Sequence, residues 1–339
     1  MKAYVLKDKA DLRYVDVDIP KISSGWALVK VKACGICSSD IPRIFTKGTY
    51  HFPTIPGHEF SGEVVAVGDS IYEKWINKRV AVFPLIPCNK CESCKKKQYE
   101  MCENYNYLGS RCDGGFAEYV AVPIWNLIEL DESISFCEGA MFEPFAVALH
   151  CLNQAKLKGG QSVAIIGSGA IAFGAGQWAK CFGAIKVCVV GRSERKRDIA
   201  KSLGIEYITI NNIKEEKYDI VIEAVGTSNS LETAIGLAVN GGKVVAMGNP
   251  SGNINLSQSI YWQILRKQLN LVGTWNSSYD GINHSEWINV RTAFLNKRIN
   301  AEALITHKFS QKELYKGLEI MKDKSEMFCK VMTIWNEEL

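Results

Sequence analysis

From residue 162 to residue 273, short apolar runs alternate with helical stretches, and this alternation limits the possible folds more than any other feature of the chain. One helical stretch runs to about Phe182, a charged one starts at Glu194, and a third lies near Leu231–Val239. Apolar strands joined by helices form a parallel sheet that is covered on both faces. The sequence therefore predicts a doubly wound α/β domain over residues 149–276. The predicted strands are Ser162–Gly167, Lys186–Val190, Glu206–Ile210, Asp219–Ala224, Lys243–Met247 and Leu269–Gly273.

The residues on either side of this region follow a different pattern. Up to about residue 145, short strands broken by Gly and Pro predict a compact, mostly antiparallel β domain. These strands include Ala27–Ala33, Glu63–Val67, Val80–Phe83 and Ala117–Val122. The tail contains predicted helices near Trp287–Leu295 and Lys312–Lys322, a short extended segment at Ala303–Thr306 and an apolar run at Val331–Trp335. We expect that last run to return to the first domain as a closing strand, so residues 1–148 and 277–339 form one domain.

A glycine-rich turn connects the first predicted strand of the α/β domain to its first helix. The turn reads Gly167-Ser168-Gly169-Ala170-Ile171-Ala172 and matches G-x-G-x-x-[G/A]. In a strand–turn–helix setting, the first glycine makes the tight turn and the second lets the backbone approach a pyrophosphate at the helix N-terminus. We expect Gly167, Gly169, Ala170 and Ile171 to bind a dinucleotide. The alternative is a glycine-rich turn that binds nothing.

The end of the second strand indicates which dinucleotide is bound. NAD-binding units place Asp or Glu there for the ribose hydroxyls, whereas this chain has Gly191-Arg192-Ser193, followed by Lys196. A glycine leaves room for a 2′-phosphate, and Arg192 with Ser193 can donate hydrogen bonds to it. The sequence therefore predicts NADP(H), with Lys196 nearby. The alternative is that these residues form a solvated helix start and that NAD(H) is bound.

Four cysteines lie close together in the segment 86–104, with the spacing C-x2-C-x2-C-x7-C. They are Cys88, Cys91, Cys94 and Cys102. Four thiolates can hold one tetrahedral zinc ion, and such a closed shell leaves no position for substrate. We therefore expect a structural zinc in this lobe. The alternative, a pair of disulfides, needs an oxidising compartment.

The bulk properties exclude several classes of protein. The net charge is +4 with both signs interspersed, which argues against nucleic acid as a partner. No apolar run approaches the ~18 residues of a membrane span. The N-terminal segment Met1–Val5 enters a strand pattern without an apolar signal region, and the chain has 12 cysteines. We therefore expect a cytoplasmic protein with reduced thiols and no membrane partner.

Other potential metal ligands are scattered along the chain, namely Cys37, His58 and Glu143. Taken singly, each has a structural explanation, as a buried filler, a core histidine and a helix N-terminal carboxylate. However, Cys37, the Gly57-His58-Glu59 box, the cysteine lobe, Gly114–Tyr119 and the glycine-rich turn occur in one order. In this order the chain resembles the zinc-dependent medium-chain dehydrogenases. The resemblance implies an α/β protein with a GroES-like β domain at both chain ends around a Rossmann domain.

The resemblance also implies a catalytic zinc held by Cys37, His58 and Glu143, with one position open for the substrate oxygen. Glu143 is similar to the residue of the sorbitol dehydrogenase branch. Glu59 is implied beside the metal, where it assists ligand exchange. Ser39 resembles the residue that accepts the substrate proton. Zinc lowers the pKa of a bound alcohol, so hydride transfer to a nicotinamide becomes easier.

Three further segments resemble the polyol-phosphate members of this family, the galactitol-1-phosphate 5-dehydrogenases. They are Ser39–Phe45, Tyr105–Phe116 and Gly273–Trp275. The expected substrate is therefore a sugar alcohol or its phosphate, with Arg43 and Arg111 on the phosphate and Trp275 lining the pocket. The alternative for the two arginines is a structural role. The alternative for the whole chain is a non-enzymatic or zinc-free NADPH-binding member of the same fold. The family resemblance further implies a homodimer or homotetramer.

Overall fold

The computed structural model describes residues 1–213, 216–281 and 285–336, and it divides into two compact units. The first unit comprises Met1–Glu143, Ser278–Lys297 and the tail from Ile305. The second comprises Pro144–Ser277 and Arg298–Leu304. The expected boundary was residue 148, but the division falls earlier because helix α4 (Phe142–Ala155) starts in the first unit and runs on into the second.

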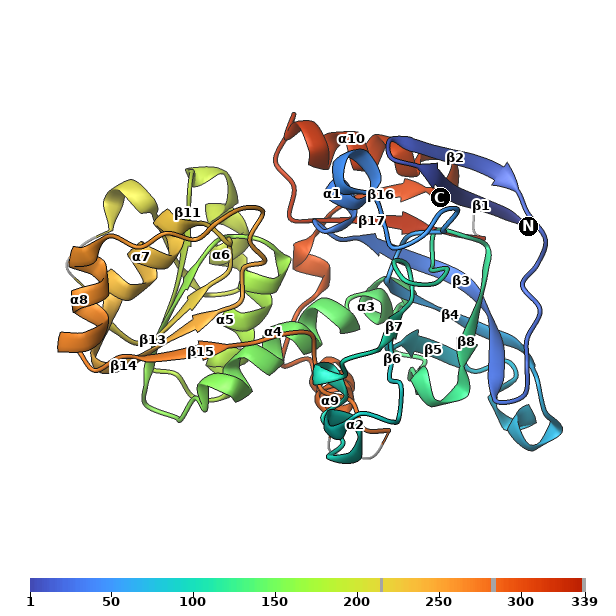
Figure 1. Ribbon diagram of the computed structural model, residues 1–339, viewed down its shortest axis with the longest axis horizontal. Coiled ribbons are helices and arrows are strands. Elements are labelled where there is room, and N and C mark those ends of the chain that lie inside the picture. The colour runs from blue at the N-terminus through green and yellow to red at the C-terminus, as the bar shows by residue number, and fades with distance from the viewer. Residues whose placement is uncertain (214–215, 282–284, 337–339) are drawn as a thin grey trace. The chain divides into compact units, whose positions relative to one another are not determined.

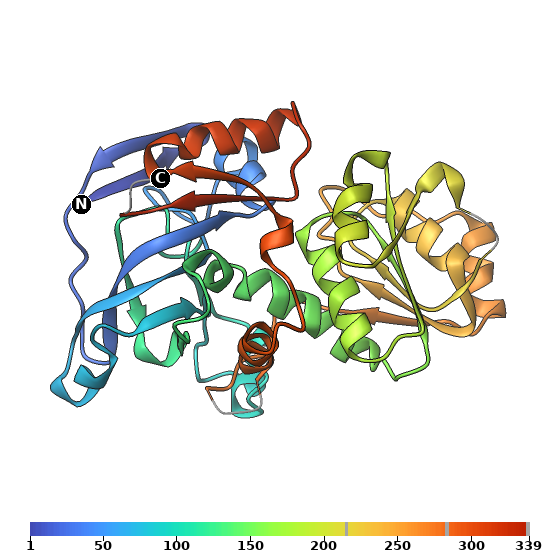
Figure 2. The same cartoon turned by 180° about the vertical axis from the view of Figure 1, so that it is seen from behind.

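The second unit is built on a six-stranded parallel sheet. Its strands are β10 (Ser162–Ile166), β11 (Lys186–Gly191), β12 (Glu206–Thr209), β13 (Tyr218–Glu223), β14 (Ala238–Ala246) and β15 (Asn270–Gly273). The order β12-β11-β10-β13-β14-β15 winds outward in both directions from β10, with helices on both faces (Figure 1, Figure 2). In such sheets, ligands bind at the carboxyl ends of the strands where the order reverses. The doubly wound fold expected from the sequence is confirmed.

Four helices accompany these strands: α5 (Ala170–Cys181), α6 (Arg197–Ser202), α7 (Ser228–Leu237) and α8 (Gln258–Arg266). Thr227 begins α7 with a capping box, in which its side chain and that of Ser230 bond each other's backbone N–H groups. The sequence analysis predicted neither α4 nor α8. Helix α8 was missed although it is amphipathic; Ile260 and Ile264 pack against the core, whereas Tyr261, Trp262 and Leu265 are exposed.

The first unit contains a seven-stranded sheet. Six of its strands follow the order β16-β17-β3-β4-β5-β9, and β8 pairs with β3. All pairs are antiparallel except β16–β17. Two small two-stranded sheets, β1–β2 and β6–β7, complete the unit. The strands are β1 (Lys2–Asp8), β2 (Asp11–Asp16), β3 (Trp26–Ile36), β4 (Glu59–Val67), β5 (Arg79–Val82), β6 (Leu85–Ile86), β7 (Asn106–Tyr107), β8 (Tyr119–Pro123), β9 (Leu127–Glu129), β16 (Ile305–Ser310) and β17 (Lys330–Ile334).

The helices of this unit are short, and they connect the strands. They include α1 (Asp40–Pro42), α2 (Glu92–Lys95), α3 (Phe136–Ala140), α9 (Glu286–Leu295) and α10 (Leu314–Asp323). The closing strand expected from Val331–Trp335 is confirmed as β17, which pairs with β3. The extended segment expected at Ala303–Thr306 starts later than predicted, because Glu302–Leu304 is a 3-10 turn.

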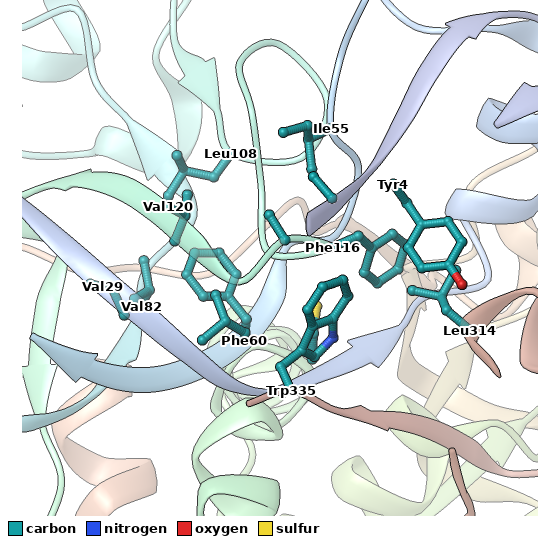
Figure 3. Close-up of a cluster of buried hydrophobic side chains, with 14 of the residues drawn as sticks. Tyr4, Val29, Ile55, Phe60, Val82, Leu108, Phe116, Val120, Leu314 and Trp335 are labelled. Carbon is teal, nitrogen blue, oxygen red and sulfur yellow. The ribbon is translucent and has the colours of Figure 1, made fainter. Parts of the chain in front are cut away.

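Both chain ends contribute to one hydrophobic core in the first unit (Figure 3). Tyr4 comes from β1, Phe60 from β4 and Trp335 from the C-terminal tail, and all three are buried. Buried aromatic side chains remove large apolar areas from water, so this cluster fixes the tail onto the sheet. No helix in the described ranges is long and apolar enough to cross a membrane.

Candidate active site

Cys37, His58 and Glu59 form a compact cluster in the first unit. Cys37 directly follows β3, and His58 and Glu59 stand where β4 begins. The two strands are antiparallel, and Gly35 faces Glu59. Because a Cβ at Gly35 would overlap Glu59 Oε2, only glycine lets this carboxylate lie against the strand. The candidate ligand atoms of the three residues lie within 4.8 Å of one another, and sulfur, imidazole nitrogen and carboxylate oxygen suit a zinc ion.

Glu143, the third ligand that the resemblance implies, lies beside this cluster but is not part of that trio. It stands in the first turn of α4, where its Oε1 accepts a hydrogen bond from the Tyr107 hydroxyl at 3.2 Å. Burial raises the pKa of the Glu143 carboxyl to about 7, with His58 opposing this shift and Glu59 adding to it. Two buried carboxylates this close repel each other, and a cation at the cluster would relieve that repulsion.

Asp40 and Ser39 lie against Cys37 and His58. Asp40 is fully buried, its Oδ2 accepts a hydrogen bond from the Cys37 backbone N–H at 3.0 Å, and its Oδ1 lies 3.5 Å from His58 Nδ1. This arrangement leaves His58 Nε2 for a metal. Burial alone would raise the pKa of Asp40, but His58 and Arg43 lower it, so the group is a carboxylate. Ser39 Oγ donates to Cys37 Sγ at 3.3 Å.

Lys330, the first residue of β17, is a site residue that the sequence analysis did not identify. Its Nζ forms an ion pair with Glu59 Oε2 and donates to the Ile36 carbonyl at 3.4 Å. Both charged side chains are buried, and breaking such a pair costs about 3–5 kcal/mol because one charge is left uncompensated. The only signal in the sequence was a lysine at the head of an apolar run. Tyr107 was likewise missed as a partner of Glu143.

The four cysteines of the predicted zinc lobe converge in the first unit. Their sulfur atoms lie within 4.8 Å of one another, with separations of 3.5 Å for Cys91–Cys94 and 3.9 Å for Cys88–Cys94 and Cys91–Cys102. A tetrahedral site with Zn–S bonds of about 2.3 Å needs sulfur atoms about 3.8 Å apart. A disulfide needs about 2.05 Å, so these separations fit a metal rather than a covalent bridge.

The thiols of this lobe have unequal acidity. Backbone N–H groups of Lys90 and Cys91 lower the pKa of Cys88 to about 6. Those of Cys94 and Glu103 lower the pKa of Cys91. Burial raises the pKa of Cys94 to about 12 and also raises that of Cys102. Thiolates are the metal-binding form, so the two acidic thiols provide the first negative charges for a cation.

The glycine-rich turn lies between β10 and α5 in the second unit, as expected. Gly167 has φ +119°, a conformation that favours glycine, and a Cβ there would lie 3.2 Å from Val225 Cγ2. Gly169 precedes the helix, and a Cβ there would have no neighbour within 4 Å. This open space lies at the N-terminus of α5, where Ala170 and Ile171 form the first turn. Such a space suits an anionic group.

Gly191 ends β11, and Arg192 and Ser193 follow it with exposed side chains. Lys196 lies closer to the glycine-rich turn, since its Nζ donates to the Ser168 carbonyl at 2.9 Å. The strand β11 is the direct neighbour of β10 in parallel register. The structure therefore brings the two sequence-predicted parts of the nucleotide site to the carboxyl ends of two neighbouring parallel strands.

Arg43 and Arg111, expected to bind a substrate phosphate, both have partners within the first unit. Arg43 donates to Asp40 Oδ1 at 2.6 Å. The Arg111 guanidinium lies between two tyrosine rings, 4.2 Å from the Tyr50 centroid and 4.3 Å from that of Tyr105. Arg111 also donates to the Tyr105 carbonyl at 3.1 Å. These contacts favour the structural alternative, most clearly for Arg111.

Trp275, expected to line the substrate pocket, lies in the second unit two residues after β15 ends. Its side chain is 52% exposed. The other candidate substrate residues belong to the first unit, so the role of Trp275 in substrate binding stays a prediction.

The chain belongs to the zinc-dependent medium-chain dehydrogenases. Residues 23–132 match the alcohol dehydrogenase GroES-like domain, and residues 170–295 match the family described as zinc-binding dehydrogenase. The family and the GroES-plus-Rossmann fold expected from the sequence are thereby confirmed, and the chain is an oxidoreductase of this family.

Two relatives with named activities are similar to this chain over most of its length. The chain is 32% identical over 323 residues to galactitol 1-phosphate 5-dehydrogenase of Escherichia coli K12, covering 91% of this chain and 93% of that protein. It is 32% identical over 272 residues to sorbitol dehydrogenase of Bacillus subtilis 168, covering 75% and 76%.

Two crystal structures share the fold over almost the whole chain. Galactitol-1-phosphate dehydrogenase from Escherichia coli has a TM-score of 0.92 at 30% identity and covers 98% of this chain and 100% of its own. A putative zinc-binding dehydrogenase from Sinorhizobium meliloti 1021 bound to NADP has a TM-score of 0.89 at 27% identity and covers 98% of both chains.

Proposed function

We propose that this protein is a zinc-dependent dehydrogenase that transfers hydride between a nicotinamide cofactor, preferably NADP(H), and a secondary alcohol of a polyol or polyol phosphate. The observation that carries the proposal is the buried cluster of Cys37, His58 and Glu59 with Glu143 beside it. A zinc-free or non-enzymatic NADPH-binding protein would not require this donor set, because it needs no catalytic metal. The donor set therefore favours the proposed enzyme over that alternative.

Cys37, His58 and Glu143 would hold the catalytic zinc, which when bound polarises the substrate hydroxyl as a Lewis acid. Asp40 orients His58 through its Nδ1 side. Ser39 Oγ, beside Cys37 Sγ, receives the hydroxyl proton of the substrate.

Two further residues of the chain hold the carboxylates in place. Tyr107 donates to Glu143 and thereby orients it. Lys330 forms an ion pair with Glu59 Oε2, so this oxygen is already engaged, which favours Glu143 rather than Glu59 as the permanent ligand. The remaining oxygen, Glu59 Oε1, is buried and has no hydrogen-bond partner among the described residues. It is the oxygen that would approach the metal during ligand exchange.

A panel of free and phosphorylated hexitols tests the substrate class. With purified protein and NADP⁺, we expect a kcat/KM about 10- to 100-fold higher for hexitol 1-phosphates than for the free hexitols. The reason is that hydrogen bonds between an ionised donor and a phosphate are worth about 1.5–3 kcal/mol. The proposal draws on the similarity to galactitol 1-phosphate 5-dehydrogenase and on Arg43, whose guanidinium uses one nitrogen for Asp40.

The same panel can contradict each part of this proposal separately. A preference for free polyols would remove the phosphate role of Arg43 and leave a sorbitol-type dehydrogenase. Turnover of no polyol, together with one zinc per chain by metal analysis, would favour the non-enzymatic or zinc-free alternative.

The cofactor preference is a second expected result. We expect NADPH to bind about tenfold more tightly than NADH, as measured by fluorescence titration of the purified protein. Arg192 and Ser193 are exposed beside Gly191, and no carboxylate ends β11 to repel a 2′-phosphate or hold ribose hydroxyls. Equal or reversed affinities would contradict the NADP(H) preference without affecting the zinc site.

A second copy of the chain is the proposed partner of the second unit. Strand β15 ends the parallel sheet, and Leu271 on β15 is 53% exposed. Helix α8 adds exposed apolar side chains at Tyr261, Trp262 and Leu265. Unpaired strand edges with apolar side chains favour pairing between copies. We expect a dimer or tetramer by light scattering, and a monomeric protein would contradict this. The cytoplasmic location stays a prediction.

A further inference from the structure

Tyr207 on β12 lies at the junction between the glycine-rich turn and the end of β11. Its side chain is buried, and its hydroxyl donates to the Ser193 carbonyl at 2.7 Å. The ring stacks on Phe173, with centroids 6.5 Å apart. The Arg197 guanidinium lies 5.7 Å from the ring centroid and donates to the Tyr207 carbonyl at 2.9 Å. Tyr207 is therefore held from several directions.

The hydroxyl of Tyr207 occupies the space beside Gly191. A Cβ on Gly191 would overlap this hydroxyl and lie 2.5 Å from Cζ of the same ring. Gly191 is not among the residues with positive φ, so its backbone conformation is open to any amino acid. Glycine at position 191 is thus required by the tyrosine beside it and not by the conformation of the strand end.

Position 191 is where an NAD-binding unit carries its ribose-binding carboxylate. We propose that Tyr207 is a specificity-determining residue, which keeps every side chain away from position 191 and so prevents the protein from carrying that carboxylate. This inference rests on the proposed NADP(H) preference and names the residue that maintains it. Sequence reasoning assigned the role to Gly191, Arg192 and Ser193, with Lys196 nearby, and did not identify Tyr207 because it comes from a different strand.

Tyr207 also affects which polar groups near position 191 are available to bind a 2′-phosphate. It binds the Ser193 carbonyl, and Lys196 is directed to the Ser168 carbonyl. The turn 191–193 is thereby held against the glycine-rich turn, with the Arg192 side chain left exposed next to it. Tyr207 acts here through the residues that it positions, and it does not need to contact the reacting atoms.

The test is a double-mutant cycle that combines Gly191→Asp with Tyr207→Leu. Leucine lacks the hydroxyl and Cζ but keeps apolar bulk beside Phe173. The dissociation constants of NADPH and NADH are measured by fluorescence titration, and Tm is measured for each protein. With Tyr207 present, we expect Gly191→Asp to weaken both nucleotides about tenfold or more and to lower Tm. In the Tyr207→Leu background, we expect the same change to strengthen NADH about tenfold and to weaken NADPH.

The control for the steric part is Gly191→Ala, which adds a methyl group without charge. It should lower Tm with Tyr207 present and be tolerated in the Tyr207→Leu background. Should a Tyr207→Leu protein not fold, Tyr207→Ile serves instead, because it also lacks the hydroxyl and Cζ and its β-branched side chain suits strand β12. Equal effects of the position 191 changes in both backgrounds would overturn the role of Tyr207.

The wild-type protein separates this inference from the proposed cofactor preference. If wild type binds NADH as tightly as NADPH, the proposed preference fails. In that case, coupling between the effects of the changes at positions 191 and 207 would still show that Tyr207 excludes a side chain from position 191. If wild type prefers NADPH but the two effects are additive, the cofactor preference stands and the role of Tyr207 is refuted.

Discussion

Replacing Cys37 with alanine is expected to lower kcat by about 10³-fold or more while the protein remains folded. Cys37 contributes a sulfur to the cluster with His58 and Glu59; it is partly buried after the end of β3 and does not belong to the hydrophobic core of the first unit. Lewis-acid polarisation is worth several kcal/mol, and each 1.36 kcal/mol changes the rate tenfold. The measurements are kcat with the best polyol of the panel, the zinc content per chain and the far-UV circular dichroism spectrum.

The matched control for this change is Cys181→Ala in the second unit. Cys181 is also a partly buried free thiol, and its sulfur contacts only the Arg298 carbonyl among the hydrogen bonds of the described residues. We expect Cys181→Ala to retain wild-type turnover and zinc content. Full activity of Cys37→Ala, or a zinc content unchanged by it, would show that Cys37 is not a ligand of the catalytic metal.

Loss of the metal in the cysteine lobe is expected to destabilise the protein strongly. For Cys94→Ala we expect Tm to fall by about 10 °C or the protein to become insoluble, with one zinc lost per chain. The lobe around Cys88–Cys102 has only short helices, α2 and one 3-10 turn, so four converging sulfur atoms are its main source of order. Structural zinc sites supply folding free energy directly, and losing one is among the largest single-residue effects.

The two proposed zinc sites should be distinguishable, because each substitution is expected to alter a different property of the protein. In the soluble fraction, Cys94→Ala should keep measurable turnover, because the catalytic cluster lies on β3 and β4. Cys37→Ala should keep a Tm near that of wild type. An unchanged Tm for Cys94→Ala would mean that the lobe folds without metal, and complete loss of turnover in folded Cys94→Ala would mean that the two sites are coupled.

The sequence predicted the elements whose signals are local. The alternation of apolar runs predicted the six parallel strands and their approximate positions in the chain, and the glycine-rich turn marked the start of α5, because periodicity and glycine conformations act over a few residues. Helix α8 escaped prediction since apolar residues occur on both its core-facing and its exposed side, which obscures the helical period. The predicted boundary at residue 148 differed from the division at Glu143, because helix α4 spans the change of unit.

The site was predictable only in part, because several of its interactions join distant segments. Cys37 and His58 were found through motif order, and their convergence follows from the pairing of β3 with β4. Lys330 and Tyr207 could not be assigned, since nothing near them in the sequence shows which strand each one meets. The contact of Arg111 with Tyr50 is invisible for the same reason, whereas Asp40, the partner of Arg43, lies only three residues away in the chain.

The ion pair of Lys330 with Glu59 affects when the enzyme can fold during its synthesis. The cation that balances Glu59 belongs to β17, 271 residues after Glu59 in the chain. During synthesis, burial of the Glu59 carboxylate is therefore unfavourable until β17 has been translated. A prematurely terminated product would lack both this lysine and the Trp335 side chain, so quality-control proteases would meet an unstable substrate rather than a nearly functional enzyme.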